Sequence, residues 1–508
     1  MKLNRLPRIQ FRGIVEAAAS LQVIIASLGA QAEPPTFARD IAPIIFDNCT
    51  QCHRPGEAGG LSFRTYDEVK NSAKLIAKVT QSKYMPPWKV SGEHGLFINE
   101  RGLSDTQIQR IADWVSAGAP EGDPALLPAL PKFTEGWQFG QPDLVIKMPE
   151  AYTVPASGPD VYINFVVPIP DLPEGKYLRA IEYRPQAKKS AHHTLFALDT
   201  KGLGRELDAD EPGPGFQGMA AALRKSRIGG WAIGAIPAPY PDDAAVPIPH
   251  GADLILESHF HPSGKEEIEQ ASVGLFFTDK KPVRQLVNVP VPFQFGVGLN
   301  IDIPAGEKHY TTGDTFTLPV DVEVYNIFPH AHYLCKEMKA TAKLPDGSTK
   351  DLIQISDWDF AWQEQYTYRE PIHLPAGTVL DTRFVFDNSA ENPRNPINPP
   401  KRVTWGPEST DEMASLAVNA IPANPSDTQK LRDAVEAYRV ASLEKVDIKL
   451  LRESAAPMIK ARLDRDHDGE ISWSERMHAM QMARKRMGDD SPLTPGLFAK
   501  FAKGMLGL

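Results

Sequence analysis

The sequence has few cysteines, no long apolar run after its N-terminus and no excess of basic residues. Only 3 cysteines occur in 508 residues, so core packing must stabilise most of the chain. Beyond residue 32, no stretch approaches the ~18 apolar residues of a membrane span. Lys and Arg number 55 against 64 Asp and Glu, which gives a formal net charge of −9. This balance argues against nucleic acid as a partner.

Proline and glycine are abundant, at 46 and 37 residues. They favour many short strands joined by turns over a large helical bundle. Because single cores rarely grow beyond about 250–300 residues, a chain of this length predicts several domains.

The first 32 residues have the pattern of a secretory signal. Basic residues from Lys2 to Arg12 precede the apolar stretch Ala17–Ala30, and Ala30-Gln31-Ala32 is a small-residue cleavage site. We therefore expect a periplasmic or secreted protein with no membrane span beyond this segment. Glu16, at the edge of the apolar stretch, leaves open whether the signal is cleaved.

Residues 49–53 read Cys-Thr-Gln-Cys-His, the C-x-x-C-H motif that attaches c-type heme. The thiols of Cys49 and Cys52 would form thioethers, and His53 would ligate the iron. An apolar helix is expected before the motif and another after it, with Ser104 as its N-cap. The pattern predicts a small all-α cytochrome c domain over residues 33–125. Cys335 is then unpaired, and we expect it to be buried.

The sixth iron ligand has two candidates. Met85 opens Met85-Pro-Pro-Trp88, where the prolines would stiffen a loop that offers the thioether sulfur. This stretch resembles the M-P-P-W segment of cytochrome c domains attached to oxidases and monooxygenases. His94 is the competing donor, and Met85 is preferred.

Residues 143–424 read as β structure after a Pro-rich linker over 126–142. Short apolar or alternating runs are bounded by turn signals such as Pro345-Asp-Gly347. About 280 residues is large for one sandwich, so we expect two antiparallel β-sandwich (jelly-roll) domains, 143–290 and 291–424.

The C-terminal segment, 425–508, is predicted to be helical and to contain an EF-hand loop at 464–475. Carboxylates occupy the loop positions that bind calcium, Gly469 makes the turn, and Glu470 would contribute its backbone carbonyl. The predicted Ca²⁺ ligands are Asp464, Asp466, Asp468, Glu470 and Glu475. A structural Ca²⁺ is expected here.

Histidines gather in three predicted strands, at His192-His193, at His259 and His261, and at His330 and His332. Residues i and i+2 project from one face of a strand, so the last pair can reach one ion. Adjacent His192 and His193 can bind one metal only if the backbone bends or bulges there. Imidazole suits copper, zinc and iron, whereas a thioether ligand would select Cu(I).

These segments, followed by Asp411-Glu-Met413, resemble in their order the copper type II, ascorbate-dependent monooxygenases, which include peptidylglycine α-hydroxylating and dopamine β-monooxygenases. The resemblance covers about residues 140–420. It implies two jelly-roll domains facing a solvent cleft, each with one copper ion. The implied ligands are His192, His193 and His259 for the electron-storing copper, and His330, His332 and Met413 for the catalytic copper that meets dioxygen.

The chain departs from the family in several places. The family's disulfides cannot form because the cysteines are missing. At the positions where peptide-hydroxylating members use Arg and Tyr, this chain has Phe328 and Ala417, so a peptide carboxylate is not expected as the substrate. His261 shares a strand face with His259 and competes with it as a ligand.

The sequence thus predicts a copper-dependent monooxygenase that hydroxylates a C–H bond of a small organic substrate with dioxygen. An external donor would supply electrons through the fused heme c. The alternatives are a non-catalytic heme and copper electron-transfer protein, and a zinc hydrolase with Glu257 as its base. Substrate identity, the physiological reductant and the oligomeric state stay open.

Overall fold

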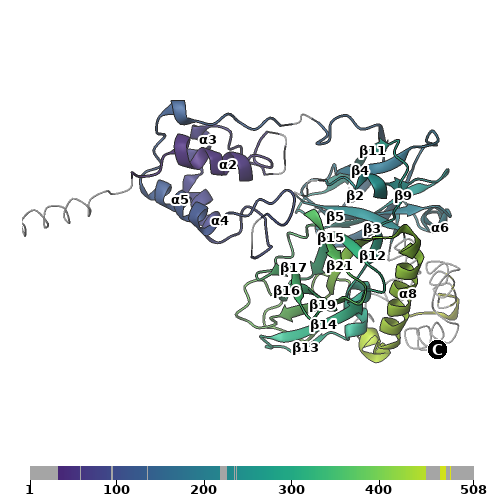
Figure 1. Ribbon diagram of the computed structural model, residues 1–508. Helices are drawn as coiled ribbons and strands as arrows, with labels where there is room; N and C mark the ends of the chain where they lie inside the picture. The colour runs from purple at the N-terminus through teal and green to yellow at the C-terminus, as the bar shows by residue number, and fades with distance from the viewer. Residues whose placement is uncertain are drawn as a thin grey trace, which may run out of the picture. The chain divides into compact units, whose positions relative to one another are not determined.

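The computed structural model describes residues 33–453, except 56, 58, 93–94, 134–135, 218–225, 234 and 236, and then 470–475, 477 and 481. The predicted signal segment, 1–32, lies outside this range. The described chain divides into two compact units (Figure 1). Residues 33–55, 61–85 and 103–131 belong to the first unit, and most of the remainder, including 86–102, belongs to the second.

The first unit is helical. Its elements are η1 (Phe37–Ile41), α2 (Ala42–Asn48), α3 (Tyr66–Asn71), α4 (Ala73–Gln81), α5 (Asp105–Ser116) and η2 (Pro124–Leu126). Ser104 caps α5 as predicted: its hydroxyl accepts from the backbone N–H of Gln107, whose side chain accepts from the N–H of Ser104. Phe37, Ile45 and Trp114 are buried in the core of this unit.

The N-terminal half of the second unit contains two main antiparallel sheets, in the strand orders β1-β11-β4-β8 and β6-β3-β9-β5-β7, and the pair β10-β2. Apolar side chains of both sheets, including Val273 from β11 and Leu256 from β9, form one core. The elements are β1 (Leu144–Lys147), β2 (Tyr152–Val154), β3 (Val161–Pro168), β4 (Tyr177–Arg184), β5 (Ala191–Asp199), α6 (Leu203–Ala209), β6 (Phe216–Gln217), β7 (Arg227–Ala232), η3 (Asp242–Ala244), β8 (Val246–Pro247), β9 (Asp253–Phe260), β10 (Glu267–Glu269) and β11 (Ser272–Thr278).

The C-terminal half repeats this plan, with the sheets β12-β21-β15-β18 and β14-β19-β16-β17 and the pair β13-β20. Its elements are β12 (Val287–Val289), η4 (Phe293–Leu299), β13 (Asp302–Ile303), β14 (Tyr310–Thr317), β15 (Val322–Ala331), β16 (Cys335–Lys343), β17 (Thr349–Ile355), β18 (Tyr366–Leu374), β19 (Val379–Phe386), β20 (Val403–Thr404), β21 (Ala414–Pro422), η5 (Pro425–Asp427) and α8 (Thr428–Glu444). No helix in the described part of the chain is long and apolar enough to cross a membrane.

The predicted antiparallel β architecture is confirmed, and two sheets around one core in each half are consistent with β-sandwiches. Cys335, at the start of β16, is buried, and burial raises the pKa of its thiol well above the ordinary value. The thiol is therefore protonated at neutral pH, in keeping with an inert core residue.

Residues 86–102 extend the C-terminal half of the second unit. Phe97 forms a β-bridge with Tyr368, and its ring stacks on that tyrosine at 4.9 Å between centroids. The guanidinium of Arg101 contacts the carboxylate of Glu364 at 2.6 Å and 3.0 Å, and both side chains are about nine-tenths buried. This pair fixes the loop that contains Gln363, which contacts the site described below.

Candidate functional site

The C-x-x-C-H motif forms a helical turn directly after α2. The backbone N–H of His53 donates to the carbonyl of Cys49 at 2.9 Å, and the His53 ring stacks on Phe63 at 4.5 Å between centroids. The buried Nδ1 of His53 has no hydrogen-bond partner among the described residues. Burial lowers the pKa of His53 and raises that of Cys49 to about 12. A neutral imidazole beside two cysteines that are not joined in a disulfide fits covalent heme.

Met85 and His94 are the two predicted candidates for the sixth iron ligand, and only Met85 lies among the described residues. Met85 lies just beyond α4 and is half-buried, and its backbone N–H donates to the carbonyl of Val79 at 3.1 Å. His94 lies outside the described residues. The assignment of Met85 to the iron stays a prediction.

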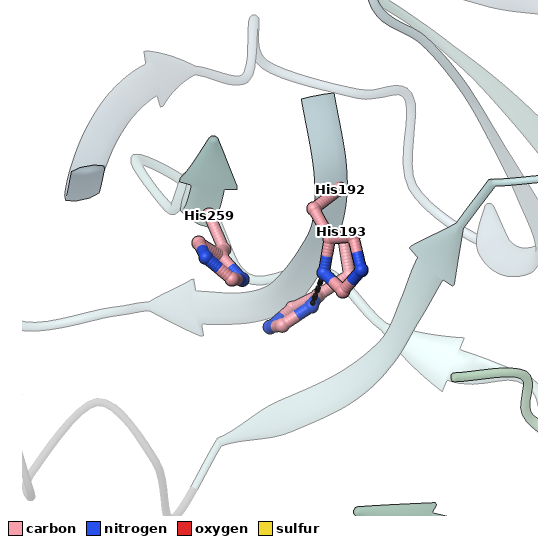
Figure 2. Close-up of side chains that lie close together, drawn as sticks. All are labelled: His192, His193 and His259. Atoms are coloured by element: carbon pink, nitrogen blue, oxygen red, sulfur yellow. Dashed lines mark hydrogen bonds between the residues drawn. The ribbon is translucent and has the colours of Figure 1, made fainter. Parts of the chain in front are cut away.

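Three of the predicted metal ligands form one buried group in the second unit. His192 and His193 come from β5 and His259 from β9 (Figure 2), and one ring nitrogen from each lies within 4.8 Å of the others. Two nitrogens bound to one metal ion at about 2.1 Å can be at most ~4.2 Å apart. Ring movements of under about 1 Å would therefore complete a three-nitrogen site.

A β-bulge brings the adjacent histidines together. Ala191 pairs with Phe260 and His193 with His259, so β5 has one extra residue, His192, between these pairs. The bulge allows both imidazoles to lie on the same side, with their Nδ1 atoms 3.1 Å apart (Figure 2). A bulge at this position was the condition for His192 and His193 to bind one metal ion, and the structure has that bulge.

His259, and not His261, joins this group. The His261 side chain is 60% exposed, and its Nδ1 lies 2.7 Å from Asp160 Oδ1. His259 is fully buried, with its Nε2 3.1 Å from Asp160 Oδ2. Neither ring nitrogen of His259 has a well-formed hydrogen bond among the described residues. A buried polar atom without a partner is costly, so two ring nitrogens that lack hydrogen bonds are in keeping with His259 as a metal ligand.

The second pair, His330 and His332, lies at the end of β15, with ring centroids 5.4 Å apart. Nδ1 of His330 donates to Oε1 of Gln363 at 2.5 Å, and the Gln363 amide donates in turn to the carbonyl of Phe360. Nδ1 of His332 donates to the carbonyl of Asp411 at 3.2 Å. These bonds orient the two rings and leave each Nε2 for a metal ion.

Met413 lies on the same sheet face as this pair. Ala331 of β15 pairs with Ala414 of β21, and His330 pairs with Ser415. Side chains alternate between faces, so Met413, one residue before Ala414, projects on the side of Ser415 and His330. Its side chain is 5% exposed and packs in the C-terminal core. Met413 is thus buried, but its backbone is adjacent to that of His332.

Glu412 joins the two segments that carry this second set of candidate ligands. Its carboxylate accepts from the backbone N–H groups of His332 at 3.0 Å, Leu334 at 2.6 Å and Met413 at 3.1 Å. The side chain is fully buried, and burial raises its pKa to about 8 despite these donors. The contacts fix the end of β15 against the start of β21.

The two groups of histidines lie next to each other. His193 and His330 have ring centroids 6.1 Å apart, and the ring of Phe360 contacts both His192 and His332. All five imidazoles are at most 8% exposed. This arrangement differs from the expected pair of sites facing a solvent cleft, because the loop between β17 and β18 places Phe360 between the two halves.

Burial keeps these imidazoles neutral. It lowers the pKa of His192 to about 3 and that of His332 to about 4, and it lowers the values for His193, His259 and His330 as well. Nearby histidines lower several of these values further. Since imidazole must be deprotonated to ligate a metal, all five are ready to bind at neutral pH.

Four supporting residues were not predicted from the sequence, namely Asp160, Phe360, Gln363 and Glu412. Glu412 directly precedes a predicted ligand, and this adjacency was a usable signal. The others lie on loops far from the histidines in sequence, so only the folded chain reveals their contacts.

Half of the predicted EF-hand loop, residues 464–469, lies outside the described residues. This half contains Asp464, Asp466 and Asp468. Glu470 is exposed, and Glu475 is buried, with its carboxylate accepting from the backbone N–H of Ser472 at 2.8 Å. Binding of Ca²⁺ stays a prediction.

A substitution at Gly406 tests how the His332 ring is oriented. A Cβ at this position would overlap the side-chain carboxylate of Asp411. The backbone carbonyl of the same residue accepts from Nδ1 of His332. We expect Gly406→Ala to weaken metal binding at the His330–His332 site by about 10–100-fold, the usual cost of disturbing an orienting partner. Copper titration with a chromophoric chelator measures this, and the His192–His193–His259 site is the internal control. Equal affinities in variant and wild type would contradict this role.

Comparison with known proteins gives no family assignment. No protein-family model and no curated protein matches the chain. Among solved structures, PNGF-II in two crystal forms aligns at 12% identity, with TM-scores of 0.26 and 0.24 over 56% of this chain. The chain spans just under two thirds of each PNGF-II chain, 66% and 65%. A structure of infectious bursal disease virus aligns at 10% identity with a TM-score of 0.17, over 55% of this chain and 72% of that chain.

Proposed function

We propose that this protein is a copper-dependent monooxygenase that hydroxylates a C–H bond of a small organic substrate with dioxygen. The observation that carries the proposal is the group of five buried, neutral imidazoles, with Met413 at the start of the neighbouring strand and on the same sheet face as His330 and His332. Imidazole alone suits several metals, but a nearby thioether favours Cu(I). A zinc hydrolase would leave Met413 without a role.

His192, His193 and His259 would hold one copper ion, and His330, His332 and Met413 the other. Copper bound there would supply the one-electron chemistry needed to activate dioxygen. The chain's own groups set up this chemistry: Gln363 and Asp411 orient two of the rings, and the ring of Phe360 contacts one histidine of each group. The short separation of His193 and His330 suits electron transfer from one site to the other.

The same proposal includes a c-type heme on Cys49, Cys52 and His53 in a cytochrome c domain, which passes electrons from an external donor. It includes jelly-roll topology for the two β halves and a structural Ca²⁺ in the 464–475 loop. Covalent heme points to the periplasm as the compartment. The heme and the Ca²⁺ each rest on a sequence motif, whereas the jelly-roll topology rests on the many short strands and on the resemblance of residues 140–420.

The neighbouring histidines of β9 offer a matched test of the first copper site. We expect His259→Ala to bind one copper ion per chain fewer than wild type, because it removes a buried ligand of the triad. His261→Ala should retain the full content, since that side chain is exposed and outside the group. Metal analysis and copper electron paramagnetic resonance of the two variants measure this. Loss of copper in His261→Ala alone would overturn the ligand assignment.

A further inference from the structure

A cavity of about 480 Å³ lies in the second unit beside the His330 site. Strands β5, β7 and β21, the η4 segment and helix α8 all contribute to its walls. This volume is within the usual range of about 300–1,000 Å³ for small-molecule sites. None of the predicted metal ligands lines it.

One wall of the cavity continues the sheet face that carries the candidate copper ligands. Ser415 and Ala417 of β21 line the cavity, and they pair with His330 and Phe328 of β15. Alternation along the strand places their side chains on the face of Met413. The ring of Phe295, another lining residue, lies 4.8 Å from the His330 ring. An occupant of this cavity would therefore lie next to the His330 site.

Helix α8 contributes another part of the cavity wall. Lining residues run along it from Gln429 to Arg439, ten residues apart, which corresponds to about 15 Å of helix. Phe293, Phe295 and Phe328 give the cavity an aromatic character. The space is thus suited to an extended apolar body.

Arg439 stands out among the charged residues of the lining. It is 8% exposed, and its guanidinium lies 5.7 Å from the centroid of the Phe293 ring. Nη1 contacts Glu436 at 3.3 Å, but the buried Nε has no hydrogen-bond partner among the described residues. An unsatisfied buried N–H of a charged group costs about 1–3 kcal/mol or more, so an acceptor at this position would be favoured.

The other charged groups of the lining have partners. Arg227 pairs with Glu257 at 2.9 Å, and Arg432 donates to the side chain of Gln285 at 2.8 Å. Asp433 accepts from Gln429 at 2.7 Å. Arg439 is therefore the lining residue whose buried guanidinium N–H is left without an acceptor among the described residues. A single guanidinium suits a singly charged anion better than an amine.

We propose that the cavity binds a monocarboxylic acid with an aromatic or long alkyl body, whose carboxylate is received by Arg439 and whose body lies along the phenylalanines toward His330. A planar guanidinium matches carboxylate geometry and strengthens the hydrogen bonds it makes to that group. The identification of this acid as the substrate rests on the proposed copper function; its binding does not.

The test is calorimetric binding of three probes of one size to the full chain, with copper content measured on the same samples. The probes are 4-phenylbutyrate, 4-phenylbutanol and 4-phenylbutylamine. Wild type should bind the carboxylate at least about tenfold more tightly than the alcohol, as a charge-assisted hydrogen bond of this kind implies. Tighter binding of the amine, equal binding of acid and alcohol, or no binding of any probe would overturn the proposal.

Three variants complete the test. Arg439→Gln should lose the preference for the acid, whereas Arg402→Gln should retain it, since Arg402 is an exposed partner of Asp302 and lies outside the lining. Ala417→Phe places a large side chain in the cavity from β21 and should abolish binding of acid and alcohol alike. Retained preference in a folded Arg439→Gln protein, or unchanged binding in Ala417→Phe, would refute the assignment. Acid binding to a chain that takes up no copper would contradict only the monooxygenase proposal.

Discussion

Met413→Ile is expected to weaken Cu(I) binding at one of the two proposed sites by at least about 100-fold and to leave the other site unchanged. Loss of an orienting partner alone costs about 10–100-fold in metal affinity, and this change removes a ligand. The effect should be larger for Cu(I) than for Cu(II), because a thioether prefers the softer ion. Competition titration with a chromophoric Cu(I) chelator resolves the two affinities.

Met338→Ile is the matched control for that experiment. Met338 lies on β16, is 1% exposed and packs in the same C-terminal core as Met413. Any effect of shortening a buried methionine on core packing should appear in both variants, whereas the effect on copper should appear only at position 413. Equal Cu(I) affinities in the two variants would remove Met413 from the site.

Glu412→Ala is expected to lower the free energy of unfolding by about 3–5 kcal/mol. The carboxylate accepts from three buried backbone N–H groups, and each donor left without an acceptor costs about 1–3 kcal/mol. The end of β15 and the start of β21 would separate, so the His330–His332 site should also bind copper more weakly. Chemical denaturation of the copper-free protein measures the free energy of unfolding without a contribution from metal binding.

Glu337→Ala provides the comparison for Glu412→Ala. Glu337 is an exposed carboxylate on β16, and its replacement should change stability by less than about 0.5 kcal/mol. Glu412→Gln should be intermediate, because its amide retains one acceptor oxygen but places an NH₂ group against backbone donors. If Glu412→Ala were as stable as Glu337→Ala, the buried carboxylate would not be the link between the two strands.

The sequence predicted those parts of the site that depend on local spacing. His330 and His332 are two residues apart on a strand, so alternation alone places them on one face. Strand β19, Val379–Phe386, coincides with a short run rich in apolar and β-branched residues, which is a local signal for a strand. For His192 and His193, local reasoning could only state a condition, a bulge, since one extra residue is a property of the pairing with β9.

The parts that sequence reasoning missed depend on contacts between distant segments. Phe360 contacts histidines of both halves from a loop whose residues carry no motif. Asp160 lies ninety-nine positions before His259 in the sequence. It contacts His259 only because strand β3, which follows Asp160, pairs with strand β9. The separation of the two histidine groups is likewise set by packing between the halves, which no spacing along the chain encodes.

The central claim is that the two histidine groups hold two copper ions and that one of these has a sulfur ligand. The most direct test is copper-edge X-ray absorption of the fully loaded, reduced wild-type protein, together with its copper content. We expect two copper ions per chain and a copper–sulfur contribution that disappears in Met413→Ile. A content of one copper or none, or a spectrum with only nitrogen and oxygen neighbours, would contradict it.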